Sequence, residues 1–161
     1  MVDDRPHPGP LPKGEGTGTG CYGLSFDWRA DAAVGSSRFE AAGIAVYKQK
    51  IRDVVEQGDL YRLESPYEKP RAALDYVSSD RSRAVLFVYQ LDDAAVAAVK
   101  PRGLDPKARY RISELNLPAG AKSQLAADGQ TVDGTTLLRD GLAPPCQKRF
   151  ESAVIELVAE K

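Results

Sequence analysis

The hydrophobic positions of this 161-residue chain change their spacing once, close to Gly58. Before this glycine, apolar side chains recur every three or four residues, which is the period of an amphipathic α-helix. The spacing predicts a helix over residues 37–57, with Ser37 and Glu40 in a capping box and Gly58 at its end. The apolar residues that share one face of this helix are Ile44, Tyr47, Ile51, Val54 and Val55.

After Gly58, apolar and polar residues alternate in short runs that turn signals separate, which is typical of β-strands. The runs RAALDYVS and RAVLFVYQL are joined by the polar turn SSDRS, as in a hairpin. DLYRL and RYRISELNL predict two more strands, GTTLLRDGL a weaker one, and SAVIELVAE a closing one. Strands without intervening helices predict a mainly β fold, a Greek-key antiparallel β-sandwich over residues 59–161.

Two features of the hairpin lead to specific expectations. The run Val85–Tyr89 is apolar at both odd and even positions, so we expect a central strand that is covered on both faces. Asp75 interrupts the preceding strand, and we expect its side chain to point outward from the apolar face and to pair with Arg71 or Arg83.

Residues 1–36 differ from the rest of the chain in composition. They are dense in proline and glycine and poor in apolar residues, so we predict a disordered tail. The string PHPGPLPKGEG also resembles a translated repetitive DNA element, which makes this tail a candidate for a spurious extension. The first residues lack the apolar run of a secretory signal, and cytoplasmic localisation is the default expectation.

The charge balance and the short apolar stretches argue against two classes of partner. Lys and Arg total 22 against 23 Asp and Glu, so the basic excess that nucleic-acid binding requires is missing. No stretch approaches the 18 or so apolar residues of a membrane span. We therefore expect neither nucleic acid nor membrane as a partner.

The sequence offers no set of residues for catalysis, for a metal or for a cofactor. His7 is the only histidine, and with Cys21 and Cys146 it falls short of a zinc site, so free thiols are favoured over a disulfide. The acids are numerous but lack a distinguishing context, and adjacent Asp92 and Asp93 are expected to keep the surface soluble. We expect no catalytic, cofactor-binding or metal-binding residue.

One aromatic residue is a candidate sugar contact. Tyr67 follows Pro66 in a predicted loop, where an exposed ring could stack on a sugar. The strand tyrosines are expected at the core or its edge.

From Tyr47 onward, several ordered blocks of the chain resemble one family. The stretch YKQKIRDVVEQGDLYRLESPYEKPRAALDYVSSDRSRAVLFVYQL, then KPRGLDPKARYRISELNL, GTTLLRDGL and SAVIELVAE, are similar to the C-terminal domain of family 36 glycoside hydrolases, the bacterial α-galactosidases. The resemblance covers residues 44–161 and implies that residues 37–58 correspond to the last helix of a catalytic barrel. The K-W-D-x-N-R motif of the family's nucleophile has no counterpart, since SFDWRAD reverses Trp and Asp and lacks the lysine.

The resemblance implies a truncated α-galactosidase, whose parent reaction is hydrolysis of terminal α-galactosides. The chain would be its non-catalytic C-terminal β-sandwich, inactive alone and bracing a missing catalytic barrel. Without the barrel, the apolar stripe of the helix could fold back on the sandwich, pair with a second copy or cause aggregation. Of these outcomes we expect a bare stripe that leads to self-association. A free-standing carbohydrate-binding module and a subunit that docks to a separately encoded barrel remain alternatives.

Overall fold

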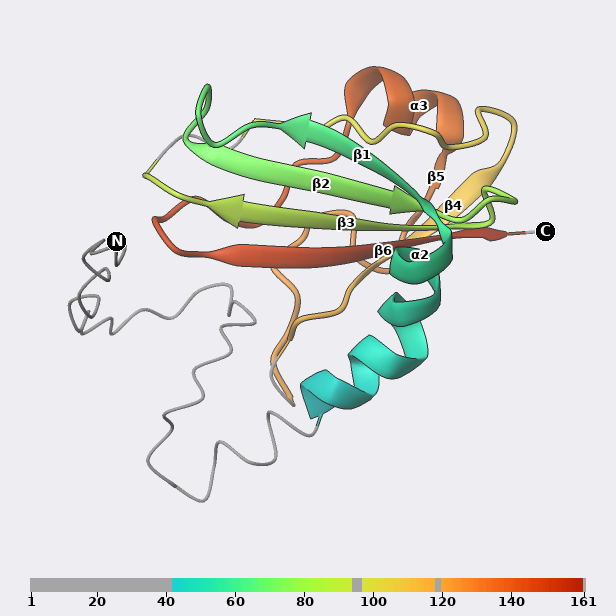
Figure 1. Cartoon of the computed structure of the whole chain (residues 1–161), viewed down its shortest axis with the longest axis horizontal. Coiled ribbons are helices and arrows are strands. Elements are labelled where there is room, and N and C mark those ends of the chain that lie inside the picture. The colour runs from blue at the N-terminus through green and yellow to red at the C-terminus, as the bar shows by residue number, and fades with distance from the viewer. Residues whose placement is uncertain (1–41, 94–96, 118–119, 161) are drawn as a thin grey trace, which may run out of the picture.

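The structure, a computed structural model, describes residues 42–93, 97–117 and 120–160 (Figure 1). The predicted tail and the predicted capping box lie outside these residues.

A helix occupies residues 42–57 and leads into the first strand. It contains a π-helical turn, η1 (Tyr47–Ile51), followed by α2 (Arg52–Gln57). Gly58 ends it and donates its N–H to the carbonyl oxygen of Val54 at 2.9 Å. A Cβ atom at position 58 would lie 2.6 Å from the backbone oxygen of Val77, so the glycine also permits close packing on the sheet. The prediction of a helix that ends at Gly58 is confirmed.

The strands form a six-stranded antiparallel sheet with the order β1-β2-β3-β6-β4-β5. The last strand lies between β3 and β4, so the order in space departs from the order in sequence (Figure 1). The mainly β, antiparallel class with one preceding helix is confirmed. The strands are β1 (Asp59–Glu64), β2 (Arg71–Val77), β3 (Arg83–Gln90), β4 (Arg109–Glu114), β5 (Thr131–Asp133) and β6 (Ser152–Glu160).

The prediction of a strand at GTTLLRDGL was wrong, because this segment forms the helix α3 (Gly134–Asp140). Leu137 is buried in the core, and Gly134 packs so closely on the Asp105 carbonyl that a Cβ atom would collide with it. Gly141, at a φ of 81°, ends the helix and donates its N–H to Leu137. Tertiary packing therefore overrides the strand-like pattern of this segment.

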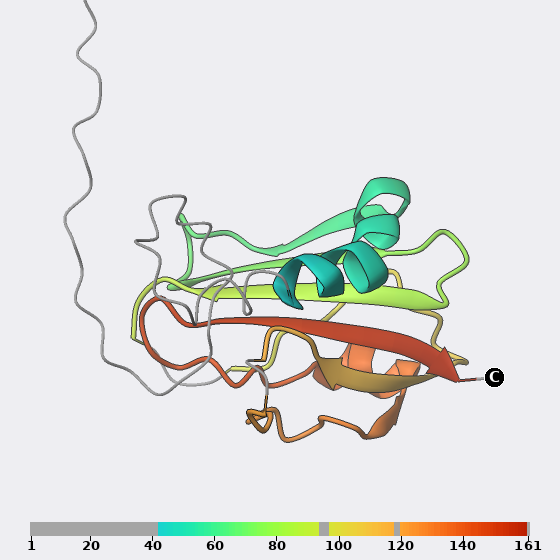
Figure 2. The ribbon, with the colours of Figure 1, turned by 90° about the horizontal axis from the view of Figure 1, so that it is seen from below.

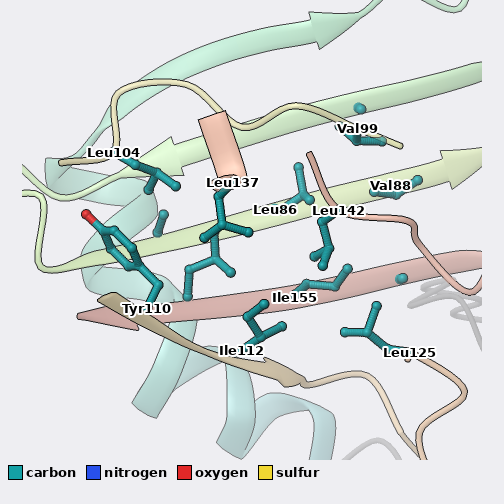
Figure 3. Close-up of a cluster of buried hydrophobic side chains, with 14 of the residues drawn as sticks. Leu86, Val88, Val99, Leu104, Tyr110, Ile112, Leu125, Leu137, Leu142 and Ile155 are labelled. Carbon is teal, nitrogen blue, oxygen red and sulfur yellow. The ribbon is translucent and has the colours of Figure 1, made fainter. Parts of the chain in front are cut away.

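The main core lies on one face of the sheet, here called the inner face (Figure 3). The layer opposite this face consists of α3 and the long connecting loops, in the place of the second sheet of a sandwich. Tyr110 joins the β2–β3 turn to the loop before β4, because its hydroxyl donates to the carbonyl of Arg81 and accepts from the N–H of Asp105. Strand residues of the core include Leu86, Val88, Tyr110, Ile112 and Ile155, and covering residues include Val99, Leu104, Leu125, Leu137 and Leu142.

The N-terminal helix packs on the opposite face, here called the outer face (Figure 2). Ile51 and Val54 are 1% and 3% exposed and contact Val85 and Val154 of the sheet. Our expectation that the whole apolar stripe would be bare was therefore wrong.

The π-helical turn explains which residues of the apolar stripe do not pack against the sheet. The N–H of Arg52 bonds to the carbonyl of Tyr47, five residues back, which shifts the phase of the helix. As a result Val46, rather than Tyr47, joins Ile51 against the sheet. Ile44 and Tyr47 remain 45% and 42% exposed.

We predict that Ile51→Ala lowers the free energy of unfolding by about 2–5 kcal/mol, because it leaves a cavity between helix and sheet. Ile44→Ala is the matched control, the same change on an exposed part of the same helix, and should cost less than about 1 kcal/mol. Urea unfolding of both variants measures the difference. Equal losses would mean that the helix is not docked as described.

Candidate functional site

Glu156 of β6 connects the helix to the outer face of the sheet. Its side chain is 3% exposed and accepts hydrogen bonds from Lys50 Nζ at 3.0 Å and from Arg83 Nη2 at 2.8 Å. Arg83 Nη2 also donates to the backbone oxygen of Lys50 at 2.6 Å. A buried carboxylate needs such partners to offset its desolvation, so this cluster holds the helix at one position on the sheet.

A second ion cluster fastens the β1–β2 connection. Arg71 donates to both carboxylate oxygens of Glu64, at 2.5 and 2.9 Å, and to the carbonyl of Ala97 at 2.7 Å. Lys69 adds a third cationic hydrogen bond at 3.1 Å. Burial alone would raise the pKa of Glu64, but Arg71 and Lys69 together hold it below its usual value. The partner of Arg71 is thus Glu64, and not Asp75 as the sequence suggested.

Asp75 points into the core, which contradicts our prediction of an outward side chain paired with an arginine. It is 0% exposed on the inner face, and its Oδ2 accepts the backbone N–H of Arg102 at 3.0 Å. Its Oδ1 has no hydrogen-bond partner among the described residues. Burial raises the pKa of Asp75 to about 7, and the Arg102 N–H offsets only part of this effect.

These acids do not form a glycosidase site. Such a site needs two carboxyl groups that face one sugar, whereas Asp75 is sealed on the inner face and Glu156 is sealed on the outer face. Asp92 and Asp93 are exposed after β3, and Asp93 accepts the backbone N–H of Arg149. The buried acids therefore serve the fold.

The described residues also contain no group of three His, Cys, Asp or Glu side chains that could hold a metal ion. Cys146 is buried in the core, while His7 and Cys21 lie outside the described residues. In the part of the chain that the structure describes, no helix is long and apolar enough to cross a bilayer.

Tyr67, the candidate sugar contact, lies in the loop between β1 and β2. It is 97% exposed, and its backbone N–H donates to Ser65 Oγ at 3.3 Å. Tyr61 and Tyr76 pack against core clusters, as expected of strand tyrosines. The sugar contact at Tyr67 stays a prediction.

An apolar area on the outer face beside the helix was not predicted from the sequence. Leu60 and Tyr89 are 43% and 39% exposed there, and three residues between them are half-buried. Tyr76 and Phe87 meet edge to face with their ring centroids 5.8 Å apart. We call this area the strand patch, and its members are Leu60, Leu74, Tyr76, Phe87 and Tyr89.

Comparison with known proteins relates this architecture to one family. The model of the "glycosyl hydrolase family 36 C-terminal domain" matches residues 71–157. Alpha-galactosidase 2 of Hypocrea jecorina is 32% identical over 71% of this chain and 14% of its own length. Alpha-galactosidase C of Emericella nidulans is 32% identical over 84% of this chain and 16% of its own length.

A solved structure of a family 36 α-galactosidase contains a similar fold. The family 36 α-galactosidase AgaA of Geobacillus stearothermophilus, in a crystal structure with raffinose, matches with a TM-score of 0.66 at 27% identity. The match covers 81% of this chain and 17% of that one. The chain thus spans 14–17% of the length of these relatives.

The environment of Asp75 predicts a pH-dependent stability. Between about pH 4 and 7 the folded protein keeps the proton on Asp75, whereas the unfolded chain, with a pKa near 3.8, has lost it. The folded state then binds more protons, so this group lowers the free energy of unfolding as the pH rises, by roughly 4 kcal/mol in total.

Asp75→Asn should remove this slope, because an amide keeps the shape of the protonated acid and cannot ionise. Its stability relative to the wild type should therefore increase between pH 5 and 8 in urea unfolding. Parallel pH profiles of the two proteins would contradict the assignment.

Proposed function

Because the chain belongs to glycosyl hydrolase family 36, as its C-terminal domain, we propose that it is the non-catalytic domain that braces the catalytic barrel of an α-galactosidase. The reaction of the whole enzyme would be hydrolysis of terminal α-galactosides. A subunit that completes a separately encoded barrel would use the same contacts.

The docked helix is the observation that supports this role. One side of it is fixed to the sheet by Ile51, Val54 and the Glu156 cluster. Its earlier turns leave Ile44 and Tyr47 exposed, so apolar surface remains for a second partner. A helix held on one side and open on the other suits an element shared between two domains.

The buried acids support a non-catalytic role. Glu64 and Glu156 are in ion pairs, and Asp75 is closed off from solvent. None of the three can approach a substrate without unfolding its surroundings. The catalytic carboxylates would therefore come from the part of the enzyme that precedes the helix.

We predict that the purified chain does not hydrolyse p-nitrophenyl α-galactoside above a buffer blank. A family 36 α-galactosidase such as AgaA of Geobacillus stearothermophilus is the positive control. Turnover by the chain that disappears when an acid between residues 44 and 161 is replaced would refute the proposal.

A carbohydrate-binding module is the second candidate, favoured by the exposure of Tyr67. A sugar platform gains from several convergent groups, and no other described aromatic ring stacks on Tyr67. We therefore predict no saturable heat of binding for galactose or raffinose up to millimolar concentration. A binding isotherm that Tyr67→Ala abolishes would instead favour the binding module.

A further inference from the structure

Strand β3 has more apolar surface than the described residues cover. Its sequence is typical of a strand that is buried on both faces, and β3 does lie between β2 and β6. On the outer face the helix covers Val85, which is 0% exposed, but it does not reach Tyr89, which is 39% exposed. The double cover that the sequence predicts is therefore complete at one end of the strand and missing at the other.

The uncovered side chains form one continuous surface, the strand patch. Leu60 lies opposite Tyr76 across the β1–β2 pair, and Leu74 lies opposite Phe87 across the β2–β3 pair. Tyr89 follows Phe87 on the same face, two residues along β3. Contiguous apolar surface of this kind marks an interaction site more often than single exposed residues do.

The patch is continuous with the contact between helix and sheet. Tyr76 and Phe87 belong to the patch and also pack against the cluster that Ile51 and Val54 form with the sheet. A partner on the patch would therefore lie beside the helix, on the same side of the sheet (Figure 2).

The position of the helix in the chain identifies this partner. The helix lies on the outer face at the start of the described residues, and relatives are about five times as long as this chain. Arg62 lies opposite Leu74 at the edge of the patch and is exposed. The partner surface should therefore be apolar with an acidic group at its border.

We infer that the strand patch is the surface that binds the catalytic barrel, next to the helix that joins the two domains. This inference rests on the proposed function and adds to it the side chains that make the contact. Tyr89 and Leu74 belong to the part of this surface that does not pack against the helix cluster.

The test is a hybrid enzyme in which residues 42–161 replace the corresponding C-terminal part of Geobacillus stearothermophilus AgaA. Tyr89→Glu puts a charge on the end of the patch away from the helix and should lower the melting temperature of the hybrid by about 2 °C or more. Tyr89→Phe keeps the apolar ring and should leave the melting temperature unchanged. Phe150→Glu puts the same charge on a residue that is 74% exposed outside the patch, and it should also have no effect.

Folding of each variant is checked by circular dichroism of the full 161-residue chain. If Tyr89→Glu perturbs the fold, Leu60→Glu replaces it, since Leu60 lies on the edge strand β1 and is 43% exposed. The inference predicts the same loss of hybrid stability for this variant.

The outcomes separate the two proposals. An active hybrid whose melting temperature is insensitive to these patch variants would overturn the inference and leave the proposed function intact. A hybrid without α-galactosidase activity would contradict the proposed function itself.

Two further results would overturn the inference, because each would show that something other than the barrel covers the strand patch. If the full chain sediments as a dimer that Tyr89→Glu dissociates, the patch binds a second copy. If removal of residues 1–41 increases the binding of an apolar dye and Tyr89→Glu cancels the increase, that segment covers the patch.

Discussion

The central strands of the sheet are apolar on both faces, and this property determines what must lie on either side of them. On the inner face, Leu86 and Ile155 are covered by α3 and the long loops. On the outer face, Val85 and Val154 are covered by the helix. Burying a large apolar side chain contributes about 1.5–3 kcal/mol, so each layer is held mainly by these contacts. Among the described residues, the outer layer covers only part of its face. The uncovered part is the strand patch, which we assign to a partner domain.

Charge gives the apolar contact between helix and sheet its specificity. Apolar packing is not directional, so Ile51 and Val54 alone would allow the helix to slide or rotate. Glu156 accepts hydrogen bonds from Lys50 of the helix and Arg83 of the sheet, and these directional contacts favour the helix position that the structure shows. In the proposed enzyme, where this helix joins the barrel to the C-terminal domain, the same three side chains would also set the angle between the two domains.

Most of the fold could be predicted from the sequence, because period-two alternation and turn residues locate the strands from Asp59 to Glu114 and the closing strand. The failures have local physical causes. In β2 both parities are apolar apart from Arg71 and Asp75, so alternation could not tell which face the aspartate occupies. α3 depends on contacts of Leu137 with distant residues. The π-helical turn shifts Tyr47 out of a stripe that simple helical periodicity places it in. The strand patch was missed for a different reason, since a sequence shows which residues are apolar but not which of them its own chain fails to cover.

The place of β6 links stability to the surface for the partner. β6 is the last strand in the sequence, yet it pairs with both β3 and β4 at the centre of the sheet. Without it, the hairpin units that contain β3 and β4 would have no common neighbour, and Val85 would lose the Val154 and Glu156 side of its surroundings. The helix site is thus complete only when β6 has been added. The strand patch also borders β6, because Phe87 and Tyr89 pair directly with Val154 and Ser152. β6 therefore supports both the helix site and one border of the strand patch.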